Sequence, residues 1–134
     1  MKIANTASAD FENKTPYSLV KLGKLYATAG RYEEALIHFK EAILLNPENH
    51  VFYFYKAISE YKMNQYLDAR VDFKKALVSN PINRYDILNY LGAIHYKLGE
   101  KEEALTLLKK VLQAFKGDKS RLQISSEEFN ALNN

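Results

Sequence analysis

The sequence contains no cysteine, and its 134 residues include only three prolines and five glycines. Without cysteine the chain forms no disulfide, no thiolate zinc site and no cysteine nucleophile, so its stability depends on packing. The longest apolar run, residues 51–55, is far shorter than the roughly 18 residues of a transmembrane helix. Residues 1–15 lack the apolar core of a secretory signal, although a mature fragment would look the same. We therefore expect a soluble, cytoplasmic protein with no membrane span.

A strong charge of either sign is also missing. Nineteen Lys and Arg face sixteen Asp and Glu, for a net charge of +3, and the basic residues are spread along the chain. Nucleic-acid-binding proteins concentrate basic residues on one surface, so we expect no nucleic-acid partner. In contrast, 47% of the residues are hydrophobic, which is enough to build the core of one folded domain.

The most informative feature is an internal repeat. Pro47 and Pro81 lie 34 positions apart, and the same spacing separates three further pairs: Ala35 and Ala69, Phe39 and Phe73, Ala42 and Ala76. A third copy follows if one extra residue is allowed after Pro81, because Gly99 and Ala104 then align with Gly30 and Ala35. A fixed period of this length is typical of a helical repeat array. The sequence predicts three repeats, over residues 16–49, 50–83 and 85–118.

Each repeat is predicted to form two antiparallel helices. In the first repeat, Pro16 suits a helix start, and Gly30 ends that helix. Apolar residues recur at three- and four-residue spacing over residues 32–43, and this second helix stops before Pro47. Small residues recur where the paired helices would cross closely: Gly23, Ala57 and Gly92 in the first helices, and Ala35, Ala69 and Ala104 in the second. The expected fold class is all-α, an antiparallel helix-hairpin repeat array.

These residues resemble a known family signature. The match is carried by Leu19, Leu22, Gly23, Tyr26, Ala35, Phe39, Ala42 and Pro47, which fall on the tetratricopeptide repeat (TPR) pattern. The resemblance implies a right-handed α-solenoid over residues 16–118. One departure is Glu60, which stands where the family prefers an aromatic residue.

The flanking segments are predicted separately. Residues 1–15 show little periodicity, and we expect a flexible tail. A repeat array needs a polar-faced helix over its last apolar face, so residues 119–134 are expected to supply a C-terminal capping helix. Two alternatives fit: a longer helix through Leu122, Ser126, Phe129 and Leu132, or a shorter one with Ser125 as N-cap and Glu128 completing a capping box.

Catalytic chemistry has few candidates. The three histidines, His38, His50 and His95, stand in no catalytic motif, and His95 occupies an aromatic position of the repeat. Glu34 and Glu41 flank His38 on one helical face, but no ligand from another element accompanies them, so a solvated surface is the better interpretation. We expect no enzyme activity, no cofactor and no metal.

The resemblance implies a concave partner-binding face on the first helix of each repeat. The candidate residues are Tyr17, Val20 and Lys24 in repeat one; Val51, Phe54, Tyr55, Ile58, Tyr61 and Lys62 in repeat two; and Asn89, Tyr90, Tyr96 and Lys97 in repeat three. Phe54, Ile58 and Tyr61 share one helical face, and we expect them opposite the face that packs through Tyr53 and Ala57. An exposed aromatic stripe usually marks an interface. The alternative is coverage by the chain's own tail or by a second copy.

The expected function is a non-catalytic protein-interaction module. Its partner would be a protein or peptide segment, extended or helical, with apolar anchors. Family members that hold acidic chaperone tails use a carboxylate clamp, whose positions here carry Val20, Lys24, Tyr55, Asp86 and Tyr90 and retain no clamp residue. The alternatives are a self-associating assembly module, a holder of a translocator segment similar to type III secretion chaperones, and, more remotely, an accessory domain of an enzyme.

Overall fold

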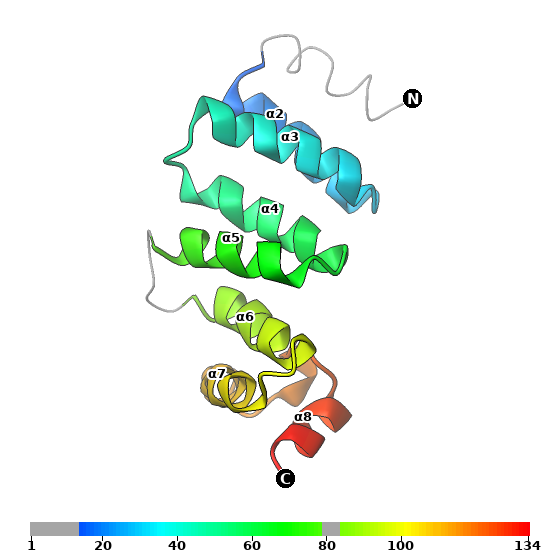
Figure 1. Ribbon diagram of the computed structural model, residues 1–134, viewed down its shortest axis with the longest axis vertical. Helices are drawn as coiled ribbons and strands as arrows, with labels where there is room; N and C mark the ends of the chain where they lie inside the picture. The colour runs from blue at the N-terminus through cyan, green and yellow to red at the C-terminus, as the bar shows by residue number, and fades with distance from the viewer. Residues whose placement is uncertain (1–13, 79–83) are drawn as a thin grey trace. The chain divides into compact units, whose positions relative to one another are not determined.

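The computed structural model describes residues 14–78 and 84–134, and within these ranges its regular structure is helical, with no strand (Figure 1). The all-α prediction is therefore confirmed. The α-helices are α2 (Pro16–Thr28), α3 (Tyr32–Leu45), α4 (His50–Lys62), α5 (Tyr66–Val78), α6 (Tyr85–Lys97), α7 (Lys101–Ala114) and α8 (Ser126–Leu132). Residues 1–13 of the predicted tail, and Pro81 of the repeat, lie outside the described residues.

The chain divides into two compact parts between Ser79 and Asn80. In the N-terminal part, α2 pairs with α3, α4 pairs with α5, and α3 packs against α4. In the C-terminal part, α6 pairs with α7, and α8 follows after a short 3-10 helix over Lys119–Arg121. None of the helices in the described ranges is both long enough and apolar enough to cross a membrane.

Local sequence explains where the helices begin and turn. The Thr15 side chain caps α2 by accepting from the Ser18 amide at 3.0 Å, and Pro16 fills the first turn, where its missing N–H costs nothing. At the turn inside each repeat, one residue takes a positive φ: Gly30 at 77°, Asn64 at 62° and Gly99 at 80°. Glycine and asparagine tolerate this left-handed conformation best, so these turns keep the repeat in register.

The predicted close helix crossings are present. A Cβ atom placed on Gly23 would lie 2.5 Å from Cε1 of Phe39, and one on Gly92 would lie 2.7 Å from Cδ2 of Leu108. Ala57 takes the same position in the second repeat and is fully buried. The small residues therefore let a large side chain of the partner helix pack directly against the helix backbone.

The C-terminal segment adopts the shorter of the two predicted capping helices. Ser125 caps α8, and Glu128 completes the capping box with reciprocal bonds of 3.0 and 2.8 Å. Residues before Ser125 do not join this helix, because Leu122 has extended backbone angles, with φ −71° and ψ 153°. Leu122 and Ile124 are nevertheless buried, so the segment packs through a bent, non-helical stretch ahead of α8 and not through a longer helix.

Candidate partner-binding surface

The surface predicted on repeats one and two has an apolar floor. Val20 of α2 is only 7% exposed and belongs to a core cluster with Leu19, Phe39 and Phe52. Tyr55 of α4 packs against the same cluster, and its ring stacks on Phe39 with 6.0 Å between centroids. Two predicted partner-binding residues from different helices are therefore brought together, and much of each side chain already packs within the protein.

Exposed side chains surround this floor. Lys24 Nζ lies 4.8 Å from the centroid of the Tyr55 ring, a cation–π arrangement that joins α2 to α4. Tyr17 and Val51, near the starts of these two helices, are 74% and 53% exposed. Both are large apolar surfaces open to solvent, as expected of residues that contact a partner.

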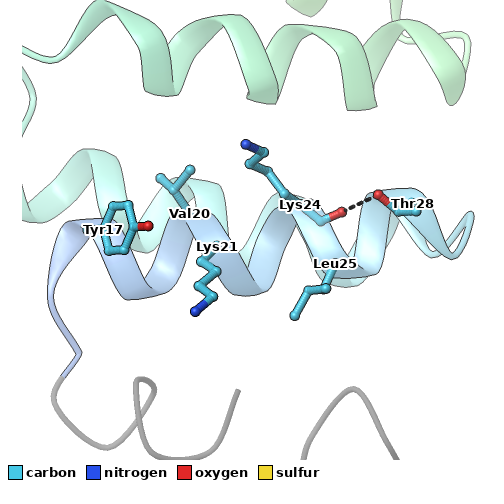
Figure 2. A pocket seen from close by; sticks show the side chains of 6 residues that line it. All are labelled: Tyr17, Val20, Lys21, Lys24, Leu25 and Thr28. Carbon is cyan, nitrogen blue, oxygen red and sulfur yellow. Dashed lines mark hydrogen bonds between the residues drawn. The ribbon is translucent and has the colours of Figure 1, made fainter. Parts of the chain in front are cut away.

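A shallow hollow of about 320 Å³ runs along α2. Figure 2 shows its lining, in which Val20 and Lys24 point to one side of the helix while Lys21 and Leu25 point to the other. Thr28 closes the far end, and its hydroxyl donates to the Lys24 carbonyl at 2.9 Å. On the side of Val20, the Lys24 ammonium lies beside apolar surface, a setting suited to an apolar segment that carries negative charge.

The aromatic stripe on α4 is less open than the spacing predicts. Phe54 packs edge-to-face with Phe73 of α5 at 6.3 Å, and Tyr61 does the same with Tyr66 at 5.6 Å. Both side chains, like Ile58 between them, are half-buried. They are therefore partly used in packing α4 against α5, whereas Lys62, the last residue of α4, is exposed.

The predicted residues on α6 have different surroundings. Asn89 is buried, and its side-chain amide is bonded to the backbone of the C-terminal segment. Tyr96 is half-buried; burial, together with a hydrogen bond to Glu128 of α8, raises the pKa of its phenol. Tyr90 is half-buried and Lys97 is exposed. In this repeat the chain's own C-terminal segment covers a part of the predicted surface.

An ionic cluster lies inside the α4–α5 hairpin, where the sequence analysis noted only Glu60. Lys56 Nζ is 2.6 Å from Asp72 Oδ2 and 3.2 Å from Glu60 Oε2. Glu60 and Asp72 are each only 3% exposed. Burial, reinforced by hydrogen bonding to Asp72, raises the pKa of Glu60 to about 8, although Lys56 opposes the shift. The raised pKa favours the protonated form of Glu60, which shares Lys56 with Asp72.

The three histidines lie on three different helices, and each one contacts a nearby group. The His38 ring stacks on Tyr26 at 5.3 Å, and His50 Nδ1 lies 2.9 Å from the Lys75 carbonyl oxygen. His95 Nδ1 lies 2.8 Å from Glu100, and with Glu103 these side chains place three ligand atoms within 4.8 Å. Because Glu103 is exposed and His95 is engaged by Glu100, we interpret this group as a surface histidine–carboxylate contact.

Sequence comparison identifies the repeat. The model of the tetratricopeptide repeat matches residues 16–49 and 85–118, together about half of the chain. The Hsp70-Hsp90 organizing protein of Triticum aestivum is 36% identical over 90 residues, which are 67% of this chain. The chain spans only 15% of that relative.

Solved structures with the same fold are more distant in sequence. The first TPR of Spaghetti (RPAP3), bound to the HSP90 peptide SRMEEVD, is 20% identical with a TM-score of 0.71, covering 89% of this chain and 90% of that one. MamA is 18% identical with a TM-score of 0.75, over 92% of this chain and 64% of that one. YrrB, described as a TPR protein with an unusual peptide-binding site, is 19% identical with a TM-score of 0.74, over 95% and 63%. The chain belongs to the tetratricopeptide repeat family.

Proposed function

We propose that this chain is a non-catalytic protein-interaction module that holds a partner segment against α2 and α4. The observation that carries the proposal is the meeting of Val20 and Tyr55 in one apolar floor, with Lys24 over the Tyr55 ring. Tyr17 and Val51 add exposed apolar surface beside it. A partner gains most from such a surface when large apolar side chains fill its centre and polar groups meet its rim.

The ligand that fits this surface has apolar anchors and acidic flanks. Lys24 and Lys62 are the charged members of the predicted set on these two helices, and both are exposed. A carboxylate clamp, as the family resemblance describes it, would need polar or basic residues where Val20 and Tyr55 stand. The surface therefore favours an internal apolar segment over a peptide read mainly through its terminal carboxylate.

A role without catalysis is supported by the histidines. Each is engaged by groups of its own surroundings: His38 by an aromatic ring, His50 by a backbone carbonyl and His95 by a carboxylate. Acid–base catalysis needs a titratable group within reach of a nucleophile or substrate in a shared site. The surface on α2 and α4 contains no histidine or carboxylate among its predicted residues.

Peptide selection tests the proposal. We would immobilise the full chain, select binders from a displayed peptide library, and compare the selected peptides with SRMEEVD. We expect enrichment of segments with two or more large apolar side chains and at least one acidic residue. Tyr17→Ala with Lys24→Ala should weaken binding of the selected peptides by about tenfold or more, because the change removes a large exposed aromatic side chain and a cation from the same surface.

The matched control is Leu44→Ala on α3, which removes a side chain that is 82% exposed. It should leave the affinity unchanged. Sedimentation at several concentrations should show the chain to be monomeric, which separates partner binding from self-association through the same surface. Equal peptide affinity in the unaltered chain, the Tyr17→Ala, Lys24→Ala variant and the Leu44→Ala control would refute the proposal. Selection of peptides without apolar anchors would refute it as well.

A further inference from the structure

Most of the large apolar side chains that are open to solvent within the described residues lie on the second helices of repeats one and two. Six of the eight are on α3 and α5, and the other two, Tyr17 and Val51, belong to the predicted partner-binding set on α2 and α4. We call the surface formed by the six the outer face; its members are Ile37, Leu44, Leu45, Leu67, Val71 and Val78. The outer face therefore shares no residue with the surface on α2 and α4.

Four members of the outer face occupy equivalent positions of the repeat. Ile37 corresponds to Val71 and Leu44 corresponds to Val78, because the members of each pair lie 34 positions apart. Their exposed fractions are 56%, 51%, 82% and 72%, respectively. A spacing of seven residues places both members of a helix on the same side of it. Scattered apolar side chains are ordinary on a protein surface, but these recur at fixed places in two repeats.

The third repeat lacks this pattern. Its equivalent positions on α7 hold Thr106 and Gln113, which are exposed and polar. None of the exposed side chains of α7 is a large apolar one. This helix still buries Ala104, Leu108 and Val111 against its own hairpin. The repeat fold therefore does not require an apolar outer face, and its presence on α3 and α5 calls for another explanation.

Each of these two helices also carries a lysine between its apolar positions. Lys40 on α3 and Lys74 on α5 occupy the same position of the repeat, and both are exposed. The exposed acidic residues of the helices, Glu33 and Asp68, lie in the first turns. Along α3 the rise from Glu33 to Lys40 is about 10 Å. The later part of each helix thus combines aliphatic side chains with a cation.

The composition of the outer face favours a lipid surface over a protein partner. All six of its apolar members are aliphatic, and the exposed cations of α3 and α5 are lysines. The centres of protein interfaces are enriched in aromatic residues and arginine, and they are depleted in lysine. Aliphatic side chains can enter the acyl boundary of a bilayer, while a lysine stem lies along apolar surface and keeps its ammonium in the headgroup layer.

We propose that the outer face of α3 and α5 docks on an anionic lipid bilayer, with the aliphatic side chains in the acyl boundary and Lys40 and Lys74 at the lipid phosphates. Figure 1 shows α3 and α5 running in the same direction, so the ends that carry Leu44 and Val78 lie on the same side of the hairpins. The contact is interfacial, because no helix in the described ranges is long and apolar enough to cross a membrane. It does not rest on the function proposed above, and either proposal can fail without the other.

Vesicle flotation tests the proposal with the full chain. One set of vesicles contains only phosphatidylcholine, and the other replaces about one third of it with phosphatidylserine. We expect the chain to bind the charged vesicles at least about tenfold more tightly than the neutral ones, because each lysine near an anionic surface strengthens binding severalfold. Lys40→Gln with Lys74→Gln should remove most of this difference.

The apolar contribution is tested by Leu44→Asp with Val78→Asp. This change places charges where the bilayer is apolar, so binding to the charged vesicles should fall by at least about tenfold. The matched control is Thr106→Asp with Gln113→Asp, which adds the same charge at the equivalent exposed positions of α7. The control should bind as the unaltered chain does, and circular dichroism should show unchanged helix content in both variants, because all four positions are exposed.

A second readout locates the contact. The chain has no cysteine, so a single Leu44→Cys or Gln113→Cys change carries one environment-sensitive fluorophore. Charged vesicles should shift the emission of the label at position 44 to the blue and leave the label at position 113 unchanged.

Three results would overturn the proposal. The first is that the unaltered chain does not bind the charged vesicles, and the second is that Leu44→Asp with Val78→Asp binds them as well as the α7 control does; both leave a protein partner as the occupant of the outer face. The third is that the unaltered chain dimerises without vesicles and this variant is monomeric, because a second copy then covers the face.

Discussion

The hairpins α2–α3 and α4–α5 have the same two-helix arrangement but different interiors. In the first, Tyr26 stacks on His38 at 5.3 Å. The equivalent positions of the second hold Glu60 and Asp72, and Lys56 bridges them where the first hairpin has Leu22. Three positions that are apolar or aromatic in one repeat are thus ionic in the next.

The comparison shows which residues the fold requires. Both hairpins keep the small residues at the crossing, Ala35 and Ala69, and the large aromatic beside them, Phe39 and Phe73, all of them buried. The interior side chains around positions 56, 60 and 72 can change chemistry as long as every charge keeps a partner. The matched family model covers residues 16–49, which include the first hairpin, and residues 85–118.

The largest expected effect comes from removing the cation of the second hairpin. Lys56→Met removes the cation that the buried Asp72 and Glu60 side chains share, so the free energy of unfolding should fall by about 3–5 kcal/mol. Urea denaturation followed by circular dichroism measures this loss. The triple change Lys56→Leu, Glu60→Tyr, Asp72→His installs the first hairpin's residues and should lose far less. If Lys56→Met and the triple variant lost the same free energy of unfolding, the interiors of the two hairpins would not be interchangeable.

Small residues at the crossing should matter equally in both hairpins. Ala35→Leu and Ala69→Leu each push a larger side chain into a fully buried position, and each should cost about 1–3 kcal/mol. Ala27→Leu, at a half-buried position, should cost less than either. Thermal melts of the three variants would test this, and a loss confined to one of the two buried positions would show that the hairpins cross differently.

The pH dependence of stability should also separate the hairpins. Because the folded pKa of Glu60 is raised from 4.5 to about 8, the unfolded chain releases this proton first, and stability should fall as the pH rises toward 8. Histidines titrate at about pH 6.5, so the slope is compared between each variant and the unaltered chain, which share the same histidines. Glu60→Gln keeps a neutral side chain of the same size and should flatten the slope, while the exposed Glu48→Gln should not. An unchanged slope in Glu60→Gln would contradict the assignment.

The smallest effect is expected at His38. Burial lowers its pKa, so the unfolded chain binds the proton more readily and the folded protein loses stability as the pH falls below about 6.5. Leu107 holds the equivalent position in repeat three, so His38→Leu should change stability at neutral pH by less than about 1 kcal/mol. Near pH 5 the variant should be the more stable protein. Denaturation curves at both pH values would reveal the opposite order if His38 were protonated in the folded state.

Periodicity predicted what depends on local spacing. The helix pairs follow from the repeat of apolar residues, and the close crossings follow from small residues such as Gly23, whose missing side chain makes room for Phe39. The capping box at Ser125 is also a local pattern, which is why one of the two predicted starts of α8 matches the structure.

Contacts between residues that are far apart in the sequence could not be predicted from the repeat spacing. Lys56 and Asp72 lie 16 positions apart on different helices, and no repeat spacing pairs them. The backbone at Arg121 reaches Asn89 from 32 positions away, and no local pattern indicates this contact. The degree to which Phe54 and Tyr61 pack on α5 depends on side-chain orientation, which sequence spacing does not determine.

The central claim is that a partner segment binds across α2 and α4, and chemical-shift mapping tests it most directly. A peptide from the selection described above would be titrated into the isotopically labelled full chain. We expect shifts that saturate at Tyr17, Lys24 and Tyr55, with the exposed Leu44 on α3 unchanged. Saturating shifts confined to α3 or α5, with none at these three residues, would contradict it.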